Sequence, residues 1–245
     1  MNKENSISSI EELQKLLEQA EKDKAALLKI VSHDLRSPMN KIFALMGLFK
    51  MAGDMTEEQQ VYLNKMEVSI SDALNRLSNL MDLRAIEGQG IDTLYETFDL
   101  GKLLKKIVDD YRIPARRKEI NISLIEEPVK FNADRQSIQR IMDQLLANAI
   151  KFSPTKSEIR VELDYRENDV LIHVIDGGYG IKEEEQQELF KKFTILSTRP
   201  TGGESSSGLG LFIAQWMAMN IGGEISYNNE NGSRFSLRLP KVEVA

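Results

Sequence analysis

The sequence contains no cysteine and only two histidines, His33 and His173. Without cysteine the chain can form neither a disulfide framework nor a thiolate metal site, which fits a reducing cytoplasm. Its 245 residues carry a formal net charge of -6. This acidic balance argues against a nucleic-acid partner, because proteins that read nucleic acids usually present a basic face.

Long hydrophobic runs are also absent. The longest apolar stretch, Ile42 to Phe49, is bounded by lysines, and it is far shorter than the roughly 20 residues that a membrane-spanning helix needs. The first residues, Met1 to Ser6, are polar and lack the apolar core of a signal peptide. We therefore expect a cytoplasmic chain, or the cytoplasmic part of a longer protein that meets a membrane only through a region absent from this chain.

Apolar residues recur at heptad spacing over residues 10–31, and the same stripe continues to Phe49. Such spacing predicts a long amphipathic helix whose first part pairs with another helix. The pattern weakens over residues 52–54, where the sequence Ala-Gly-Asp interrupts it. We therefore expect the helix to end in a short turn at this point.

A second helix start follows this turn. Thr56 and Gln59 have the spacing of a capping box, with Thr56 as N-cap. Apolar residues then recur at helical spacing until the pattern runs down near Glu87 and Gly88. Two long helices joined by a short turn form an antiparallel hairpin that has almost no core of its own. We therefore expect two copies to associate into a dimeric four-helix bundle.

The stretch Gly88-Gln89-Gly90 is the best candidate for a domain boundary, because the pattern changes there to mixed helix and strand. It separates a helical domain over residues 1–90 from a second domain over residues 91–245. In the second domain the sequence predicts helices at 100–113, 135–152 and 208–221, and strands at 120–125, 159–163, 170–175, 224–228 and 234–239. This order predicts an α/β sandwich, with helices on one face of a mixed sheet. The whole chain is then of the α+β class.

His33 is the first residue that could carry chemistry. It lies about 200° around the helix from Val31 of the apolar stripe, so its imidazole should face solvent. Asp34 can orient the ring or raise its basicity. Arg36, three residues on, lies on the same side and could meet an incoming phosphate. A lone histidine on a helix surface usually has no chemical role. The neighbouring Asp34 and Arg36 favour a role here, and they make His33 a candidate nucleophile.

Asn148 and Lys151 share one face of the predicted helix 135–152. An amide oxygen and an ammonium together suit a Mg²⁺–triphosphate, because the oxygen can bind the metal and the lysine can neutralise phosphate charge. The same pair is equally compatible with an ordinary helix C-terminus, where Lys151 would answer the helix dipole.

Two glycine-rich segments lie next to predicted elements: one follows a strand and the other opens a helix. Asp176 ends a predicted strand, where it could accept a hydrogen bond from an adenine amino group, although a strand-ending turn is also compatible with this sequence. Gly208 and Gly210 open a predicted helix whose free N–H groups could hold a phosphate, although capping alone could explain them. The intervening loop, residues 195–207, has a length typical of a lid or binding loop.

In this order the motifs resemble the catalytic core of bacterial sensor histidine kinases. Residues 32–38 are similar to the H-box of that family, residues 148–153 to its N-box, and residues 176–181 to its first glycine box. Phe190 and Phe193 resemble its phenylalanine box, and residues 207–211 its second glycine box. Each motif alone is moderately specific, whereas the ordered set is highly specific.

The resemblance implies a dimerising phosphoacceptor hairpin followed by an ATP-binding domain of the Bergerat fold. His33 would attack the γ-phosphate of ATP, with Asp34 polarising it, and Asn148 would hold Mg²⁺. The phosphoryl group would then pass to an aspartate of a response regulator. Ser37 stands where phosphatase-competent members often have threonine or asparagine, and it can still position a water.

The resemblance also implies a nucleotide site. Its residues would be Gln144, Asn148, Lys151, Asp176, Gly178, Gly180, Ile181, Phe193, Gly208, Leu209 and Gly210. Asp176 would contact adenine, and the loop through residues 201–203 would be the ATP lid. Gln144 stands where the family usually has an asparagine, which keeps the amide chemistry but gives it a longer reach.

Two alternatives remain to be weighed. Chaperone and topoisomerase ATPases share the asparagine, aspartate and glycine motifs, but they lack an upstream helical hairpin with the run from His33 to Pro38. A degenerate kinase that serves as a dimeric scaffold would not need His33, Asn148 and Asp176 intact. Because the whole set of motifs agrees, we predict an active protein histidine kinase.

Overall fold

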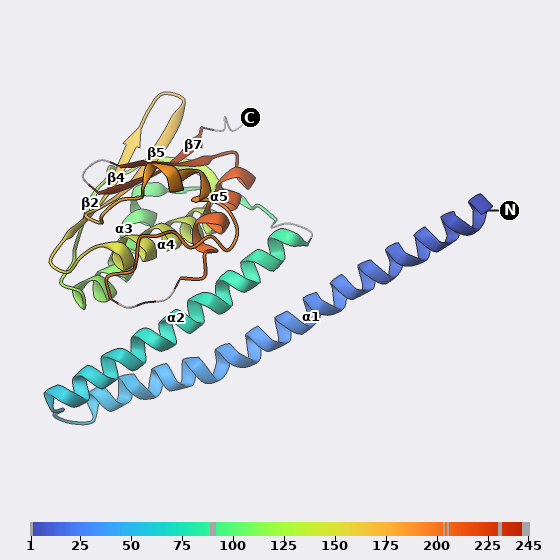
Figure 1. Cartoon of the computed structure of the whole chain (residues 1–245). Coiled ribbons are helices and arrows are strands. Elements are labelled where there is room, and N and C mark those ends of the chain that lie inside the picture. The colour runs from blue at the N-terminus through green and yellow to red at the C-terminus, as the bar shows by residue number, and fades with distance from the viewer. Residues whose placement is uncertain (1, 89–91, 203, 205, 230–231, 242–245) are drawn as a thin grey trace. The chain divides into compact units, whose positions relative to one another are not determined.

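The computed structural model describes residues 2–88, 92–202, 204, 206–229 and 232–241. The chain divides into two compact units, Met1–Gly88 and Gln89–Ala245. The first is a helical hairpin and the second is an α/β domain, which confirms the predicted fold class (Figure 1). Gln89 and Gly90 of the predicted boundary, and Gly203 of the predicted lid, lie outside the described residues. So does Asn231, between the last two predicted strands.

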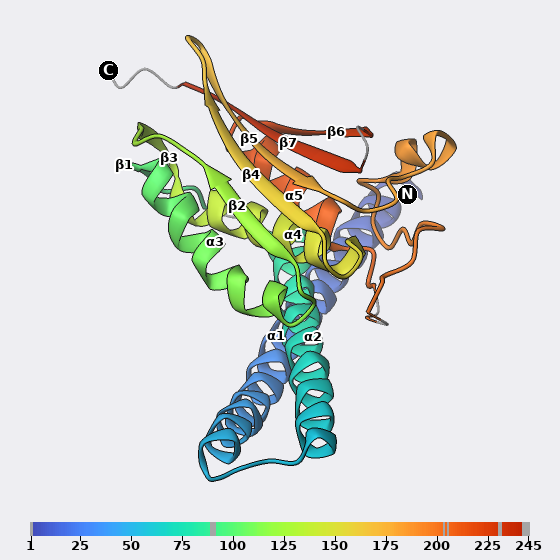
Figure 2. The ribbon, with the colours of Figure 1, turned by 90° about the vertical axis from the view of Figure 1, so that its left-hand side faces the viewer.

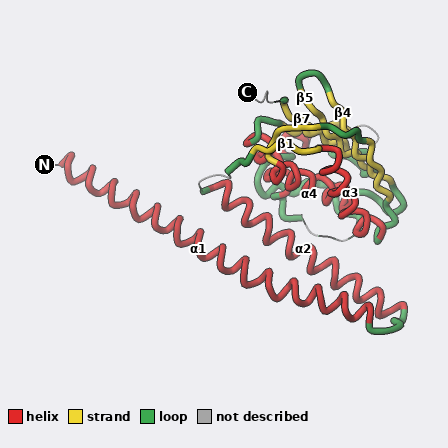
Figure 3. Tube along the Cα trace, turned by 180° about the vertical axis from the view of Figure 1, so that it is seen from behind, coloured by secondary structure: helices red, strands yellow, loops and turns green. Residues whose placement is uncertain are grey.

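The hairpin consists of α1 (Asn2–Met51) and α2 (Glu57–Glu87), which run antiparallel (Figure 3). The predicted capping box is present at the start of α2. The Gln59 N–H donates to Thr56 Oγ1 at 3.2 Å, and the Thr56 N–H donates to Gln59 Oε1 at 2.9 Å. These two bonds satisfy N–H groups that a helix start otherwise leaves without partners. The helix ends at Glu87, as predicted.

The hairpin buries little apolar surface. Among the side chains that the structure describes in this unit, Met46, Leu63 and Leu83 are the buried apolar ones. Lys50 Nζ lies 2.8 Å from Glu67 Oε1 and links the two helices. Eight large apolar side chains of α1 are between 49% and 62% exposed: Leu16, Leu17, Leu27, Ile30, Ile42, Leu45, Leu48 and Phe49. The prediction that the hairpin has almost no core of its own is therefore confirmed.

A five-stranded mixed sheet forms the centre of the second unit. Its strand order is β2-β4-β5-β7-β6, in which β2 and β4 pair in parallel and the other neighbours pair antiparallel. The strands are β2 (Asn121–Ile125), β4 (Glu158–Tyr165), β5 (Asp169–Asp176), β6 (Glu224–Asn229) and β7 (Ser233–Pro240). All five were expected from alternating or apolar sequence runs, with bounds that differ by one or two residues.

Three helices cover one face of this sheet (Figure 2). They are α3 (Leu100–Arg116), α4 (Arg135–Phe152) and α5 (Gly210–Asn220). Along β5, Val170, Ile172 and Val174 are fully buried. Because side chains alternate along a strand, Asp176 continues the same inward-facing series. The row of buried apolar side chains along β5 therefore ends, at the C-terminal end of the strand, with the Asp176 carboxylate.

Three short elements were not expected from the sequence. Strands β1 (Tyr95–Asp99) and β3 (Lys130–Asp134) pair antiparallel in a separate two-stranded sheet, and a 3-10 helix, η1 (Glu183–Glu188), follows the glycine-rich loop. Both strands are short and rich in polar residues, so neither shows a clear alternating pattern.

The start of α5 requires a correction. The sequence predicted that this helix begins at Gly208, whereas it begins at Gly210. Gly208 has a φ of +69°, which is incompatible with a right-handed helix and places it in the preceding turn. Among the described residues no helix is both long enough and apolar enough to cross a membrane.

Candidate functional site

His33 lies on the solvent side of α1, as predicted. Its side chain is 84% exposed, whereas the preceding Ser32 is buried. His33 Nδ1 lies 3.2 Å from Asp34 Oδ1. When the Nδ1–H donates to this carboxylate, Nε2 keeps its lone pair in the open and can act as a nucleophile. Arg36 and Ser37 on the same helix are exposed as well.

Two side chains of the predicted nucleotide site, Gln144 and Asn148, lie beside the start of α5. A Cβ added at Gly210 would lie 2.6 Å from Gln144 Oε1 and 4.0 Å from Asn148 Nδ2. A side chain at this position would displace the Gln144 amide from the start of α5. Leu209, the N-cap residue, provides no side-chain cap. The N–H groups at the start of α5 thus lie near two amide side chains, an arrangement that can bind phosphate.

Asp176 lies at the end of β5 and is only 5% exposed. Its Oδ1 accepts a hydrogen bond from the Gly178 N–H at 2.7 Å. Burial raises the pKa of Asp176 from 3.8 to about 6, although hydrogen bonds from Gly178 and Ser233 act in the opposite direction. The site therefore holds a carboxylate whose charge is poorly solvated. An additional hydrogen-bond donor would stabilise the ionised form of this carboxylate.

The glycine loop after Asp176 also touches the end of α4. A Cβ at Gly178 would lie 2.7 Å from Asp176 Oδ1 and 3.2 Å from the Phe152 carbonyl oxygen. Only a residue without a side chain fits between these atoms. The loop therefore brings Asp176 next to the helix that carries Asn148 and Lys151. The Lys151 ammonium itself lies 5.7 Å from the Phe152 ring centroid.

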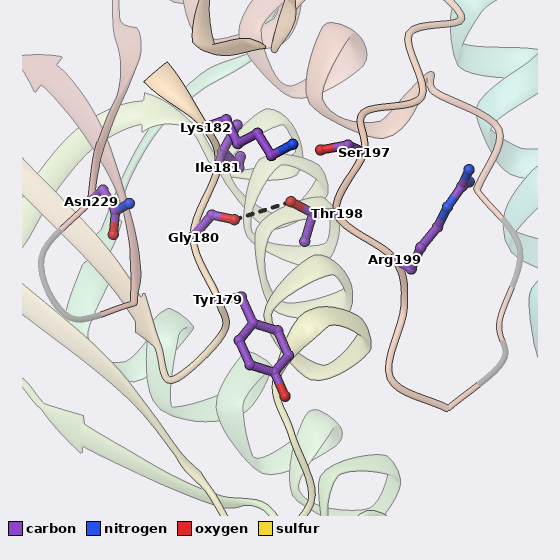
Figure 4. Close-up of a pocket in the computed structure, with 8 residues that line it drawn as sticks. All are labelled: Tyr179, Gly180, Ile181, Lys182, Ser197, Thr198, Arg199 and Asn229. Atoms are coloured by element: carbon purple, nitrogen blue, oxygen red, sulfur yellow. Dashed lines mark hydrogen bonds between the residues drawn. The ribbon is translucent and has the colours of Figure 1, made fainter. Parts of the chain in front are cut away.

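A cavity of about 530 Å³ lies between the glycine loop and the start of loop 195–207 (Figure 4). Its lining residues are Tyr179, Gly180, Ile181, Lys182, Ser197, Thr198, Arg199 and Asn229. Thr198 Oγ1 donates to the Gly180 carbonyl at 3.1 Å across one wall. Gly180 has a φ of +70°, and a Cβ there would lie 2.6 Å from Asn229 Nδ2.

The cavity includes only part of the predicted site. Gly180 and Ile181 line it, whereas Asn148 and Asp176 do not. Sequence reasoning did not single out Lys182, Thr198, Arg199 or Asn229. The first three lie next to or within segments that were singled out as a glycine box and a lid, so proximity was their only signal. Asn229 ends a strand that is distant in sequence, and no motif marks it.

The two ends of loop 195–207 are held together. A Cβ at Gly208 would lie 2.5 Å from the Phe193 carbonyl carbon and within 2.7 Å of two Thr194 backbone atoms. Phe193 has a φ of 60°, and its side chain is exposed. At the N-terminal end of the loop, Glu185 accepts hydrogen bonds from the Ser197 N–H and hydroxyl at 2.8 and 2.7 Å. These two bonds lower the pKa of Glu185.

His173 is part of the core rather than of the site. It is buried, and its Nδ1 lies 2.7 Å from Ser236 Oγ. Burial, reinforced by the charge of Arg234, lowers the pKa of His173. Within the described parts of the chain, no three His, Asp or Glu side chains are arranged to hold a metal ion.

Two family models match the chain in the order of these elements. The His Kinase A (phospho-acceptor) domain matches residues 23–89, and the histidine kinase-, DNA gyrase B-, and HSP90-like ATPase matches residues 133–243. The first range contains His33, and the second contains Asn148, Asp176 and Gly208. The chain has the catalytic core of a two-component histidine kinase. Its resemblance to that family is thereby confirmed.

This histidine kinase core is 27% identical over 239 residues to the aerobic respiration control sensor protein ArcB of Escherichia coli (strain K12). It is 29% identical over 240 residues to the sensor histidine kinase RcsC of the same strain. Both alignments cover 95% of this chain, but only 30% of ArcB and 25% of RcsC. The kinase chain thus spans less than a third of the length of these curated relatives.

Solved structures support the same fold for the kinase. Full-length ShkA in complex with AMPPNP aligns with a TM-score of 0.64 at 22% sequence identity. The alignment covers 89% of this chain and 46% of that chain. At this level of identity the likeness shows the arrangement of helices and strands in a histidine kinase, and nothing finer.

Proposed function

We propose that this chain phosphorylates itself on His33 with ATP and then transfers the phosphoryl group to an aspartate of a response regulator. The helical domain, residues 1–90, would dimerise and carry the phosphoryl group, and residues 91–245 would bind the nucleotide. One observation carries the proposal. An exposed histidine with an adjacent carboxylate occurs in a phosphoacceptor-type domain that is followed by an ATPase-type domain.

The adenine end of the site would lie at Asp176. An ionised carboxylate that is 5% exposed can accept a hydrogen bond from the adenine amino group, and a charged acceptor in a poorly solvated site forms a strong bond. The backbone of Gly178, Gly180 and Ile181 would approach the base, because Gly178 and Gly180 carry no side chain that could stand between them. Gly180 also has a φ of +70°, which favours glycine. The complex of full-length ShkA with AMPPNP supports a nucleotide in this fold.

The phosphate end would lie between α4 and α5. Asn148, Gln144 and the uncapped start of α5 lie close together around Gly210, and Lys151 follows Asn148 on the same helix. Mg²⁺ in ATP sites is usually held by one or two protein oxygens and by phosphate oxygens, so the single amide oxygen of Asn148 fits this metal. Once bound, Mg²⁺ would neutralise charge on the phosphates.

In the transfer step, a bond forms between His33 Nε2 and the γ-phosphorus while the bond from that phosphorus to the bridging oxygen of ADP breaks. Asp34 would hold the Nδ1–H throughout and stabilise the positive charge that develops on the ring. Arg36 would contact the transferred phosphoryl group, and Ser37 would position a water in any reverse reaction on the regulator.

Dimerisation would bury the apolar side chains that one hairpin leaves exposed. The exposed set on α1 extends from Leu16 to Phe49, and a helical hairpin with an exposed stripe on this scale normally completes its core with a second copy. A four-helix bundle of two hairpins is therefore the proposed quaternary structure.

The test is incorporation of label from γ-labelled ATP with Mg²⁺ into the wild-type chain and into His33→Gln. We expect acid-labile label in the wild type and none in the variant, because phosphohistidine hydrolyses in acid. His173→Gln is the matched control and should retain its label if it folds. Acid-stable label that His33→Gln does not remove would contradict the proposal. Absence of label despite ATP binding would favour the scaffold alternative.

A further inference from the structure

Lys118 belongs to none of the sequence motifs, yet it contacts the C-terminal end of α4, the helix that carries Asn148 and Lys151. It stands between α3 and β2, and its side chain is 13% exposed. Its Nζ donates to the Ile150 carbonyl at 2.7 Å and to the Lys151 carbonyl at 2.9 Å, and it lies 3.4 Å from Glu204 Oε1. An ammonium group has three donors, and these three contacts can use all of them.

Loop 195–207 reaches the same helix end independently. The Thr201 N–H donates to the Lys151 carbonyl at 3.1 Å, and the Thr201 hydroxyl donates to the Ser153 carbonyl at 2.5 Å. The second carboxylate oxygen of Glu204 accepts from the Gly202 N–H at 2.9 Å. The C-terminal end of α4 thus accepts hydrogen bonds from Thr201 of the loop and from Lys118, and Lys118 in turn pairs with Glu204 of the loop.

The physical setting makes this ion pair stronger than an exposed one. The last carbonyl groups of a helix lack partners within the helix and carry partial negative charge, so Lys118 is favourably placed there. Glu204 is only 19% exposed, and a partly buried pair is screened less by solvent and salt. A segment that such contacts hold in place before the ligand arrives loses less conformational entropy when the ligand binds.

We propose that Lys118 and Glu204 are positioning residues of the nucleotide site. Together with Thr201 they form a latch that holds the loop against the end of α4 and so slows the release of a bound adenine nucleotide. The latch rests on the proposed function, because it acts on the nucleotide that α4 and the glycine loop would hold. Neither residue needs to touch the nucleotide for this effect.

The test measures nucleotide release from the full chain by stopped-flow displacement of a fluorescent ADP, mant-ADP, with excess ADP. Glu204→Gln keeps the shape of the side chain but removes its charge, and it should release mant-ADP about 3- to 10-fold faster. Thr201→Val removes an independent contact and should also release faster. Lys118→Arg keeps the positive charge and should stay close to the wild type.

Glu224→Gln is the matched control. It removes a carboxylate that pairs with Arg238 at 2.8 Å on β6 and β7, and it should leave release unchanged. Melting of the nucleotide-free chain should be alike in Glu204→Gln and Glu224→Gln. Equal release rates in the wild type and Glu204→Gln would overturn the latch. The latch would also be overturned if Glu204→Gln and Glu224→Gln both released mant-ADP faster and both melted at a lower temperature than the wild type. If the wild type binds no mant-ADP, the proposed nucleotide site fails and the latch fails with it.

Discussion

Replacing Asp176 by asparagine should strengthen the fold and weaken nucleotide binding. Burial raises the pKa of Asp176 from 3.8 to about 6, which corresponds to about 3 kcal/mol against the ionised form in the folded state. The folded-state pKa lies above the unfolded one. The neutral acid therefore gives its full contribution to stability below about pH 4, and that contribution is lost as the pH rises through about 6.

Asparagine does not titrate, so Asp176→Asn should avoid this loss. At pH 7.5 we expect the variant to be more stable than the wild type by about 1–3 kcal/mol, and near pH 4.5 the difference should shrink. Nucleotide affinity should change in the opposite sense. Losing a charged acceptor for the adenine amino group costs about 1.5–3 kcal/mol, so ADP should bind about 10- to 100-fold more weakly.

The assay combines denaturant unfolding at several pH values with calorimetric titration of ADP. Asp143→Asn is the matched control, because burial also raises the pKa of Asp143, on α4, to about 6. It should gain stability at pH 7.5 and keep its affinity for ADP. An Asp176→Asn variant that is less stable at pH 7.5, or that binds ADP as well as the wild type, would refute the reasoning.

Three further substitutions test other parts of the account. Gly208→Ala should destabilise the second unit by about 2 kcal/mol or more, because the residue has a positive φ and its Cβ would meet the Phe193 backbone; thermal unfolding measures this. Thr56→Ala should remove the capping box and cost about 1 kcal/mol of hairpin stability, while ADP affinity measured by calorimetry stays constant. Leu48→Glu, at a position that is 58% exposed in one hairpin, should convert a dimer to a monomer in light scattering. Unchanged thermal unfolding in Gly208→Ala or in Thr56→Ala, or a Leu48→Glu variant that is still a dimer, would count against the corresponding contact.

Local signals in the sequence were sufficient for much of the fold. The capping box at Thr56 and Gln59 fixes a helix start through residues three apart, and the apolar periodicity of α4 predicts both of its ends, Arg135 and Phe152. Such features depend on neighbours in sequence. The mixed sheet followed from alternating runs whose inward faces now form the core.

The features that sequence reasoning missed depend on residues that are distant in the chain. Strands β1 and β3 are polar and are defined by their mutual pairing. Lys118 contacts Glu204 only because the fold brings the α3–β2 junction to the end of α4. Asn229 reaches the glycine loop in the same way. No local sequence pattern predicts these long-range contacts. The order of the motifs could therefore indicate the nucleotide site but not the contacts that support it.

The most direct test of the central claim is to identify the phosphorylated atom. After incubation with ATP and Mg²⁺, ³¹P NMR of the denatured chain distinguishes a phosphoryl group on Nε2 of histidine from one on Nδ1, and peptide mapping assigns the residue. Because Asp34 holds Nδ1 at 3.2 Å, the account predicts phosphorylation of His33 on Nε2. Phosphate on Nδ1, on another residue or nowhere in a chain that binds ATP would contradict it.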